Sequence, residues 1–139
     1  MIITIRISGL VGRNKNIKET LHRLRLRRKY TAVLLKSTQE NLKLLKKIRD
    51  HIAYGDIDKQ TLLELIEKRA ILKKKGYKIK PESIISQLEK DSKNLDIKPF
   101  FRLHPPRGGI DAKNHFGTSR KAVLGDNKEK INDLVRRML

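Results

Sequence analysis

The sequence contains no cysteine. This absence excludes disulfide bonds, thiolate catalysis and cysteine-ligated zinc, and it fits a protein of a reducing compartment. No run approaches the roughly 18 apolar residues that a transmembrane helix requires. The opening MIITIRISG is not expected to be a signal peptide, because it lacks a basic start and Arg6 interrupts its short apolar run. We therefore expect a soluble, cytoplasmic protein with no membrane partner.

Acidic residues are also scarce. Asp and Glu number 15 against 34 Lys and Arg in 139 residues, a net charge of +19. A compact chain with this charge repels itself unless a polyanion neutralises it. Hydrophobic residues make up 37% of the chain, which suffices for the modest core of one domain. Composition thus predicts a polyanion-binding domain.

The charge is unevenly distributed. Basic and acidic side chains number 14 and 3 in residues 1–55, 10 and 8 in residues 56–97, and 10 and 4 in residues 98–139. Two basic segments therefore flank a near-neutral middle. We expect a β-α-β-α core with a basic first helix in 1–55, a helical insert in 56–97, and a strand, basic loop and C-terminal helix in 98–139. Such asymmetry points to a binding face.

Three segments are expected to form strands. Residues 2–8 alternate, which places Ile3, Ile5 and Ile7 on one buried face. Residues 30–36 are β-branched and apolar, and residues 98–104 begin with Pro99, which favours a strand end or an edge.

Helices are expected where a capping residue precedes an apolar stripe of helical spacing. The expected first residues are Asn16, Ser37, Asp58, Pro81 and Asp126. Gly55 and Gly76 are expected to end the second and third helices. His22 and His51 fall on expected helices and are predicted to lie at the surface or at the boundary of the core.

The segment 105–125 shows no sustained period. Loops of this length in a compact domain are usually functional or disordered. Pro105 and Pro106 stiffen it, and Gly108 and Gly109 allow positive φ and close approach to a phosphate. The segment and the strand before it supply candidate RNA-binding cations and histidines, which are Arg102, His104, Arg107, Lys113, His115, Arg120 and Lys121. The alternative is a solvated loop with incidental charge.

A second basic group lies near the N-terminus. No acidic residue lies between Thr20 and Gln39, so intrahelical ion pairs cannot balance the five cations there, which are Arg23, Arg25, Arg27, Arg28 and Lys29. Counter-charges on a partner explain them better. Arg13 and Lys15 follow a Gly-containing turn that can present a helix N-terminus to phosphate, although the glycines can equally serve turn geometry alone. The spacing matches no nucleotide-binding P-loop.

No catalytic or metal-binding constellation can be placed. His104, Asp111 and His115 match no standard metal spacing, and no nucleophile–base pair or paired catalytic carboxylates are evident. We expect no enzyme activity, metal, cofactor or small-molecule substrate.

The segment FFRLHPPRGG at residues 100–109 carries a family resemblance, together with the AYG turn at 53–55 and INDLVRRM at 131–138. The sequence resembles the archaeal and eukaryotic branch of the large-subunit ribosomal protein "L thirty" family (eukaryotic "L seven"). The resemblance implies an α+β fold, in which a three-stranded antiparallel sheet carries two helices on one face (a split β-α-β arrangement), with an insert and a C-terminal extension. It also implies a structural role in cytoplasmic ribosomes, bound to large-subunit ribosomal RNA near the small 5S RNA and to neighbouring ribosomal proteins.

Three alternatives remain. A DNA-compacting chromatin protein would share the charge, and comparable affinity for random duplex DNA would favour it. A nuclease or RNA-modifying enzyme would require a catalytic constellation, and turnover that a single Asp, Glu or His substitution abolishes would favour it. A ribosome-assembly factor would differ from a ribosomal subunit protein by leaving the mature subunit.

Overall fold

The computed structural model describes residues 1–72, 84, 97–110 and 114–139. In this part of the chain the sheet has the order β4-β2-β1-β3-β5. Its strands are β1 (Ile2–Arg6), β2 (Thr31–Leu35), β3 (Ile52–Asp56), β4 (Phe101–Arg102) and β5 (Gly125–Asp126). All neighbours pair antiparallel except β3 and β5, which are parallel.

The helices are α1 (Lys15–Arg23), α2 (Gln39–Lys47), α3 (Lys59–Arg69) and α5 (Ile131–Met138), the last preceded by the short 3-10 helix η1 (Lys128–Lys130). They confirm the α+β class. Among the residues described, none of the helices is long and apolar enough to cross a bilayer.

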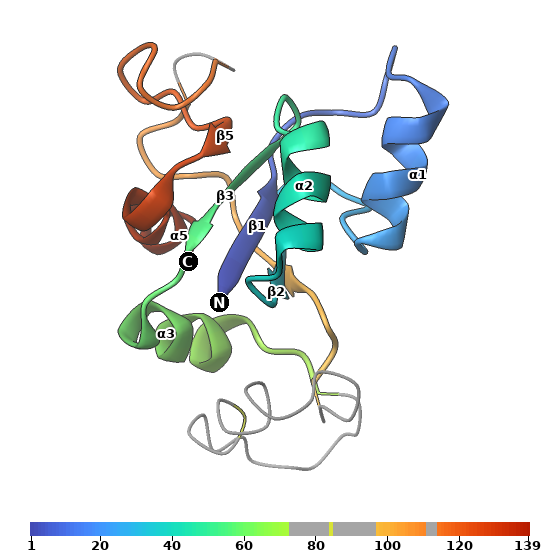
Figure 1. Cartoon of the computed structure of the whole chain (residues 1–139). Coiled ribbons are helices and arrows are strands. Elements are labelled where there is room, and N and C mark those ends of the chain that lie inside the picture. The colour runs from blue at the N-terminus through green and yellow to red at the C-terminus, as the bar shows by residue number, and fades with distance from the viewer. Residues whose placement is uncertain (73–83, 85–96, 111–113) are drawn as a thin grey trace.

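Helices cover both faces of the sheet (Figure 1). On one face, Leu21 of α1 and Leu45 of α2 share an apolar cluster with Ile2 of β1. On the other, residues of α3 and α5 pack with Ile3 and Ile5. The prediction of one buried face for residues 2–8 is therefore wrong, because each face of β1 packs against its own pair of helices. Thr4, Arg6 and Ser8 on the second face are buried as well.

The three-stranded sheet predicted from the sequence is too small. Residues 52–56 form β3 beside β1, and Gly55 lies within this strand instead of ending a helix. Ile52 also fitted the helical spacing of the preceding segment, which concealed the strand. The expected strand 98–104 is reduced to β4, which lies at the sheet edge as Pro99 indicated.

Two predicted helix starts shift by one or two residues. Asn14 caps α1, since its side chain accepts a hydrogen bond from Asn16 N. Thr38 caps α2 in the same way through Asn41 N. These corrections exchange one short polar side chain for a near neighbour, and the predicted apolar faces are unaffected.

The C-terminal half shows one agreement and two corrections. α3 follows Asp58 as predicted, but it ends at Arg69, before Gly76. Asp126 lies in β5 and its carboxylate accepts a hydrogen bond from Lys128 N at the start of η1, so the α-helix α5 begins only at Ile131. The helix predicted from Pro81 lies outside the described residues apart from Ile84, which is buried. The division into three segments stays a prediction, although α3 packs on the sheet beside α5.

Candidate nucleic-acid interface

The loop between α1 and β2, residues 24–30, begins with a Schellman motif. Leu26 N donates to Leu21 O at 2.8 Å, and Arg25 N donates to His22 O at 2.9 Å. The next-to-last position of this motif needs a left-handed backbone and usually holds glycine. Here it holds Arg25, with φ of 61°. A side chain in this conformation costs about 1 kcal/mol relative to glycine.

Arg6 holds the same loop from beneath. Its side chain is 3% exposed, and its Nη1 donates to Leu26 O at 3.0 Å and to Arg27 O at 2.6 Å. Its Nε donates to Ser8 O at 2.9 Å. Burial lowers the pKa of Arg6, although a guanidinium remains charged at neutral pH. Because these bonds all reach backbone carbonyls, the buried cation fixes the path of the loop and leaves the loop's own side chains free.

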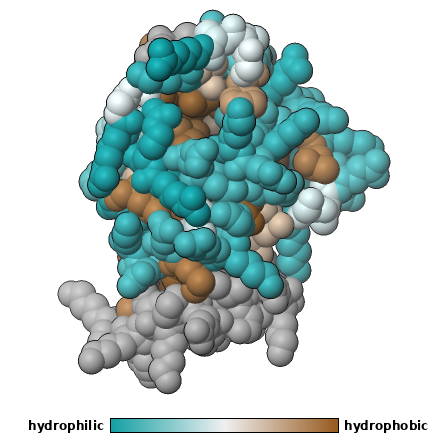
Figure 2. Space-filling view, turned by 90° about the vertical axis from the view of Figure 1, so that its left-hand side faces the viewer, coloured by the Kyte–Doolittle hydropathy of each residue, from teal (hydrophilic) through white to brown (hydrophobic). Residues whose placement is uncertain are grey.

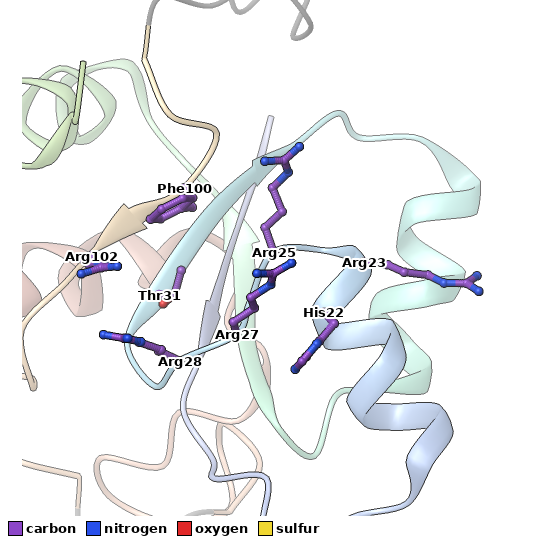
Figure 3. Close-up of a pocket in the computed structure, with 8 residues that line it drawn as sticks. All are labelled: His22, Arg23, Arg25, Arg27, Arg28, Thr31, Phe100 and Arg102. Carbon is purple, nitrogen blue, oxygen red and sulfur yellow. The ribbon is translucent and has the colours of Figure 1, made fainter. Parts of the chain in front are cut away.

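A cavity of about 520 Å³ opens beside this loop (Figure 3), lined by His22, Arg23, Arg25, Arg27, Arg28, Thr31, Phe100 and Arg102. Phe100 and Arg102 come from the distant β4 segment, which the pairing of Arg102 with Thr31 brings alongside β2. In Figure 3 the Arg23 side chain projects away from the others, and it forms an exposed ion pair with Glu19 at 2.6 Å.

In the part of the chain that the structure describes, no acidic residue lines the cavity. Among the described residues, Arg25, Arg27 and Arg28 make no ion pair with a carboxylate, and neither does Arg102. Like charges that line one cavity repel one another, and an anion between them removes the repulsion. A planar guanidinium can donate two parallel hydrogen bonds to two oxygens of one phosphate, so the cavity is suited to a phosphate-bearing ligand.

The Pro106–Gly109 segment forms a tight turn. Gly109 N donates to Pro106 O at 3.0 Å, and Gly108 takes the positive φ of 75° that this turn requires. Arg137 of α5 fixes the turn through Nε to Arg107 O at 3.0 Å and Nη2 to Gly109 O at 2.6 Å. The N–H of Gly109 is thus already donated within the chain. The Arg107 side chain is exposed and has no polar partner among the described residues.

The other candidates of the 105–125 segment differ in their surroundings. His115 Nε2 donates to Asp50 Oδ1 at 2.8 Å, and a Cβ on Gly125 would lie 2.9 Å from its Nδ1. Its Nε2 is therefore occupied within the chain, while its side chain is 43% exposed. Lys121 Nζ donates to Gly108 O at 3.1 Å, whereas His104 and Arg120 are exposed. Lys113 lies outside the described residues.

The face on the α5 side is covered largely by hydrophilic side chains, with hydrophobic ones only in small areas between them (Figure 2). Arg13, Lys15 and Lys29 are exposed, but they do not line the cavity. The structure therefore brings together Arg23 and the arginines of the 24–30 loop with Arg102, and Lys121 with the Pro106–Gly109 turn. Other candidates lie outside these two groups.

Sequence reasoning missed several residues of these sites. Phe100 and Thr31 enter the cavity only through the β4–β2 pairing, which no local pattern announces. Arg137 was hidden in the apolar stripe of the last helix. Arg6 did leave a signal, because a charged residue inside a buried strand requires partners.

His51 is buried, not at the surface or at the boundary of the core as predicted. It is 4% exposed, and its Nδ1 lies 2.9 Å from Ser8 Oγ. Ile7 N and Ser8 N donate to its carbonyl at 3.0 and 3.2 Å. The pKa of His51 is lowered from 6.5 by burial first and by the nearby charges of Arg13 and Arg6, against an opposing effect of Asp50.

Stability is therefore expected to fall as the pH drops below about 6.5. The unfolded chain protonates His51 before the folded chain does, so the contribution is complete above the unfolded pKa and lost below it. One group accounts for a slope of at most about 1.4 kcal/mol per pH unit. Thermal melts between about pH 7.5 and pH 5.5 of the native chain and His51→Asn measure it. The variant should show the shallower pH dependence, and equal slopes would contradict the prediction.

Known proteins resemble the chain along nearly its whole length. The sequence profile of the family described as "Ribosomal protein L30p/L7e" matches residues 2–52. Three archaeal proteins named "Large ribosomal subunit protein uL30" are similar to it. The Pyrobaculum islandicum protein is 34% identical over 97% of this chain and 92% of its own, the Methanococcus maripaludis protein 37% over 97% of each, and the Methanobrevibacter smithii protein 37% over 100% of each. The chain therefore belongs to the ribosomal protein L30p/L7e family.

Proposed function

We propose that the chain is a structural constituent of the large ribosomal subunit and binds ribosomal RNA through the cavity beside the 24–30 loop. The observation that carries this proposal is the group of arginines from two distant segments that meet without a carboxylate. Membership of a ribosomal protein family supports it independently. The role is structural and the location is the ribosome, with ribosomal RNA and ribosomal proteins as partners. Nearness to the 5S RNA stays a prediction from the family resemblance.

The proposed contacts form three groups. The cavity contributes Arg23, Arg25, Arg27, Arg28 and Arg102, with Lys29 beside them. The start of α1 contributes Arg13 and Lys15. The C-terminal segment contributes His104, Arg107, Gly108, Gly109, Arg120 and Lys121, with Lys113 carried from the sequence alone. His115 remains a candidate of this segment, with its Nε2 paired to Asp50 as Arg23 is paired to Glu19.

The mechanism is neutralisation of phosphates by cations that the fold has already positioned. Arg6 fixes the loop backbone and Arg137 fixes the Pro106–Gly109 turn, so less ordering remains to be done on binding. Phosphate contacts of this kind dominate affinity and make it depend strongly on salt. Folded RNA is recognised by shape and by unpaired bases, which favours structured ribosomal RNA over a uniform duplex.

The test is binding of the purified chain to large-subunit ribosomal RNA at several salt concentrations, with random duplex DNA as competitor. We expect log K to fall by about 0.7–0.9 per phosphate contact for each tenfold rise in salt, and a clear preference for the RNA. A flat salt dependence would contradict the proposal. Equal affinity for the DNA would favour a chromatin protein, and absence from mature large subunits in sucrose gradients would favour an assembly factor.

Arg25→Gly is expected to make the fold more stable and RNA binding weaker. Glycine relieves the left-handed backbone at φ of 61°, for a gain of about 1 kcal/mol, but it removes a cavity cation. Thermal melts and RNA titrations of the same variant measure the two effects. Arg25→Ala serves as the control, because it removes the cation without relieving the backbone. A glycine variant with unchanged RNA affinity would exclude Arg25 from the interface.

Arg107→Ala is expected to weaken RNA affinity by about 1 kcal/mol or more and leave the melting temperature nearly unchanged. The turn is held by the backbone atoms of Arg107, which alanine retains, while its side chain is exposed. Arg137→Ala provides the contrast, because it breaks the hydrogen bonds that fix the turn and should lower both quantities. A similar loss of both in Arg107→Ala would make Arg107 a residue of the fold.

A further inference from the structure

Phosphate binding by the arginines does not account for the phenyl ring of Phe100 in the cavity lining. Aromatic residues are only 4% of this sequence, with 3 Phe, 3 Tyr and no Trp. One of these few rings, Phe100, lines the arginine cavity. It also packs against the apolar cluster under α1 and α2, which holds the ring in place. A phosphate cannot stack on a phenyl ring, whereas the flat face of a nucleobase can.

In the described part of the chain the Phe100 ring is only partly buried. The guanidinium carbon of Arg102 lies 5.9 Å from the ring centroid, close to the outer limit of about 6 Å for a cation–π contact. Such a contact is weak at an accessible site, and a base can displace it or share the ring. Arg102 then becomes available to a phosphate on the same nucleotide.

The size and the polar lining fit the same ligand. The cavity volume of about 520 Å³ lies within the range of roughly 300–1,000 Å³ in which proteins bind small organic ligands. Thr31 also lines it from a largely buried position (5% exposed), and its hydroxyl is a polar group of the cavity wall that can both donate and accept a hydrogen bond. A base edge or a ribose 2′-hydroxyl provides the matching groups.

We propose that the cavity receives one unpaired nucleotide of the bound RNA, with its base stacked on Phe100 and its phosphate held by Arg102 and the 24–30 loop. The inference rests on the proposed function, because it names the part of the RNA that this site takes. A base within a continuous duplex is stacked on both faces and cannot reach the ring, so the nucleotide must be bulged or lie in a loop.

The test uses two RNA hairpins that differ only by a single unpaired adenosine in the stem. We expect the native chain to bind the bulged hairpin about tenfold more tightly than the paired one. Phe100→Leu keeps an apolar side chain on the cluster and should lose this preference, whereas Phe100→Tyr keeps the ring and should retain it. Lys59→Ala, at an exposed position of α3 outside the cavity lining, should leave both affinities and their ratio nearly unchanged.

Equal affinity of the native chain for the two hairpins would overturn the inference and leave the proposed function standing. So would a Phe100→Leu variant that retains the preference, and the native-chain comparison remains decisive if that variant does not fold. Absence of salt-dependent binding to both hairpins and to large-subunit RNA would instead contradict the proposed function itself.

Discussion

Replacing Gly55 with alanine is expected to destabilise the fold by about 3 kcal/mol. A Cβ on Gly55 would lie 2.2 Å from Lys128 O and 3.0 Å from Ile131 Cβ. The nearest of these atoms is a backbone oxygen of η1, which cannot move away as a flexible side chain could. The helix α5 would have to separate from β3, on which it packs.

Thermal and denaturant unfolding measure this loss, which should lower the melting temperature by roughly 10 °C in a domain of this size. Gly9→Ala is the matched control. A Cβ there would meet only Lys29 Cε, at 3.6 Å, which is ordinary contact with a flexible side chain. Similar stability of the two variants would mean that β3 and η1 do not approach each other as the structure has them.

Gly55 also shows where sequence reasoning reaches its limit. Its predicted role as a helix end rested on neighbouring residues. Position 55 instead requires glycine because the carbonyl of Lys128, more than seventy positions further along the chain, leaves no room for a Cβ. Local patterns did predict what local physics determines. The alternation of residues 2–8 predicted β1, and the stripe from Ile131 to Met138 predicted α5. Whether a face of β1 is buried depends on helices that pack on it from elsewhere.

The candidate interface was likewise only partly predictable from the sequence. The basic run of residues 23–29 was evident because no acidic residue lies between Thr20 and Gln39, although Arg23 does pair with Glu19, one helical turn before it. The position of Arg102 beside this run could not be predicted, because it depends on the register of β4 against β2. The left-handed conformation of Arg25 was also hidden, since arginine gives no local signal for a position that usually holds glycine. Sequence therefore identified the cations, and tertiary pairing decided which of them share a site.

Removing one cation from each side of the cavity is expected to produce the largest loss of RNA affinity. Arg27 belongs to the loop and Arg102 to β4, and both are exposed. If each neutralises one phosphate, Arg27→Ala/Arg102→Ala should reduce the slope of log K against log salt by about 1.5–2. Affinity at moderate salt should fall by roughly 30- to 100-fold, since each charge-assisted contact contributes about 1–1.5 kcal/mol.

The control must separate a local contact from the general effect of net charge. Lys59→Ala/Lys68→Ala removes the same charge from exposed positions of α3, outside the cavity lining. Screening limits the influence of such remote charges to about one Debye length, roughly 8–10 Å in physiological salt. The control should therefore bind RNA with nearly the native slope. If the two double variants lose the same affinity and slope, the chain holds RNA through its overall charge, and the cavity has no special part in binding.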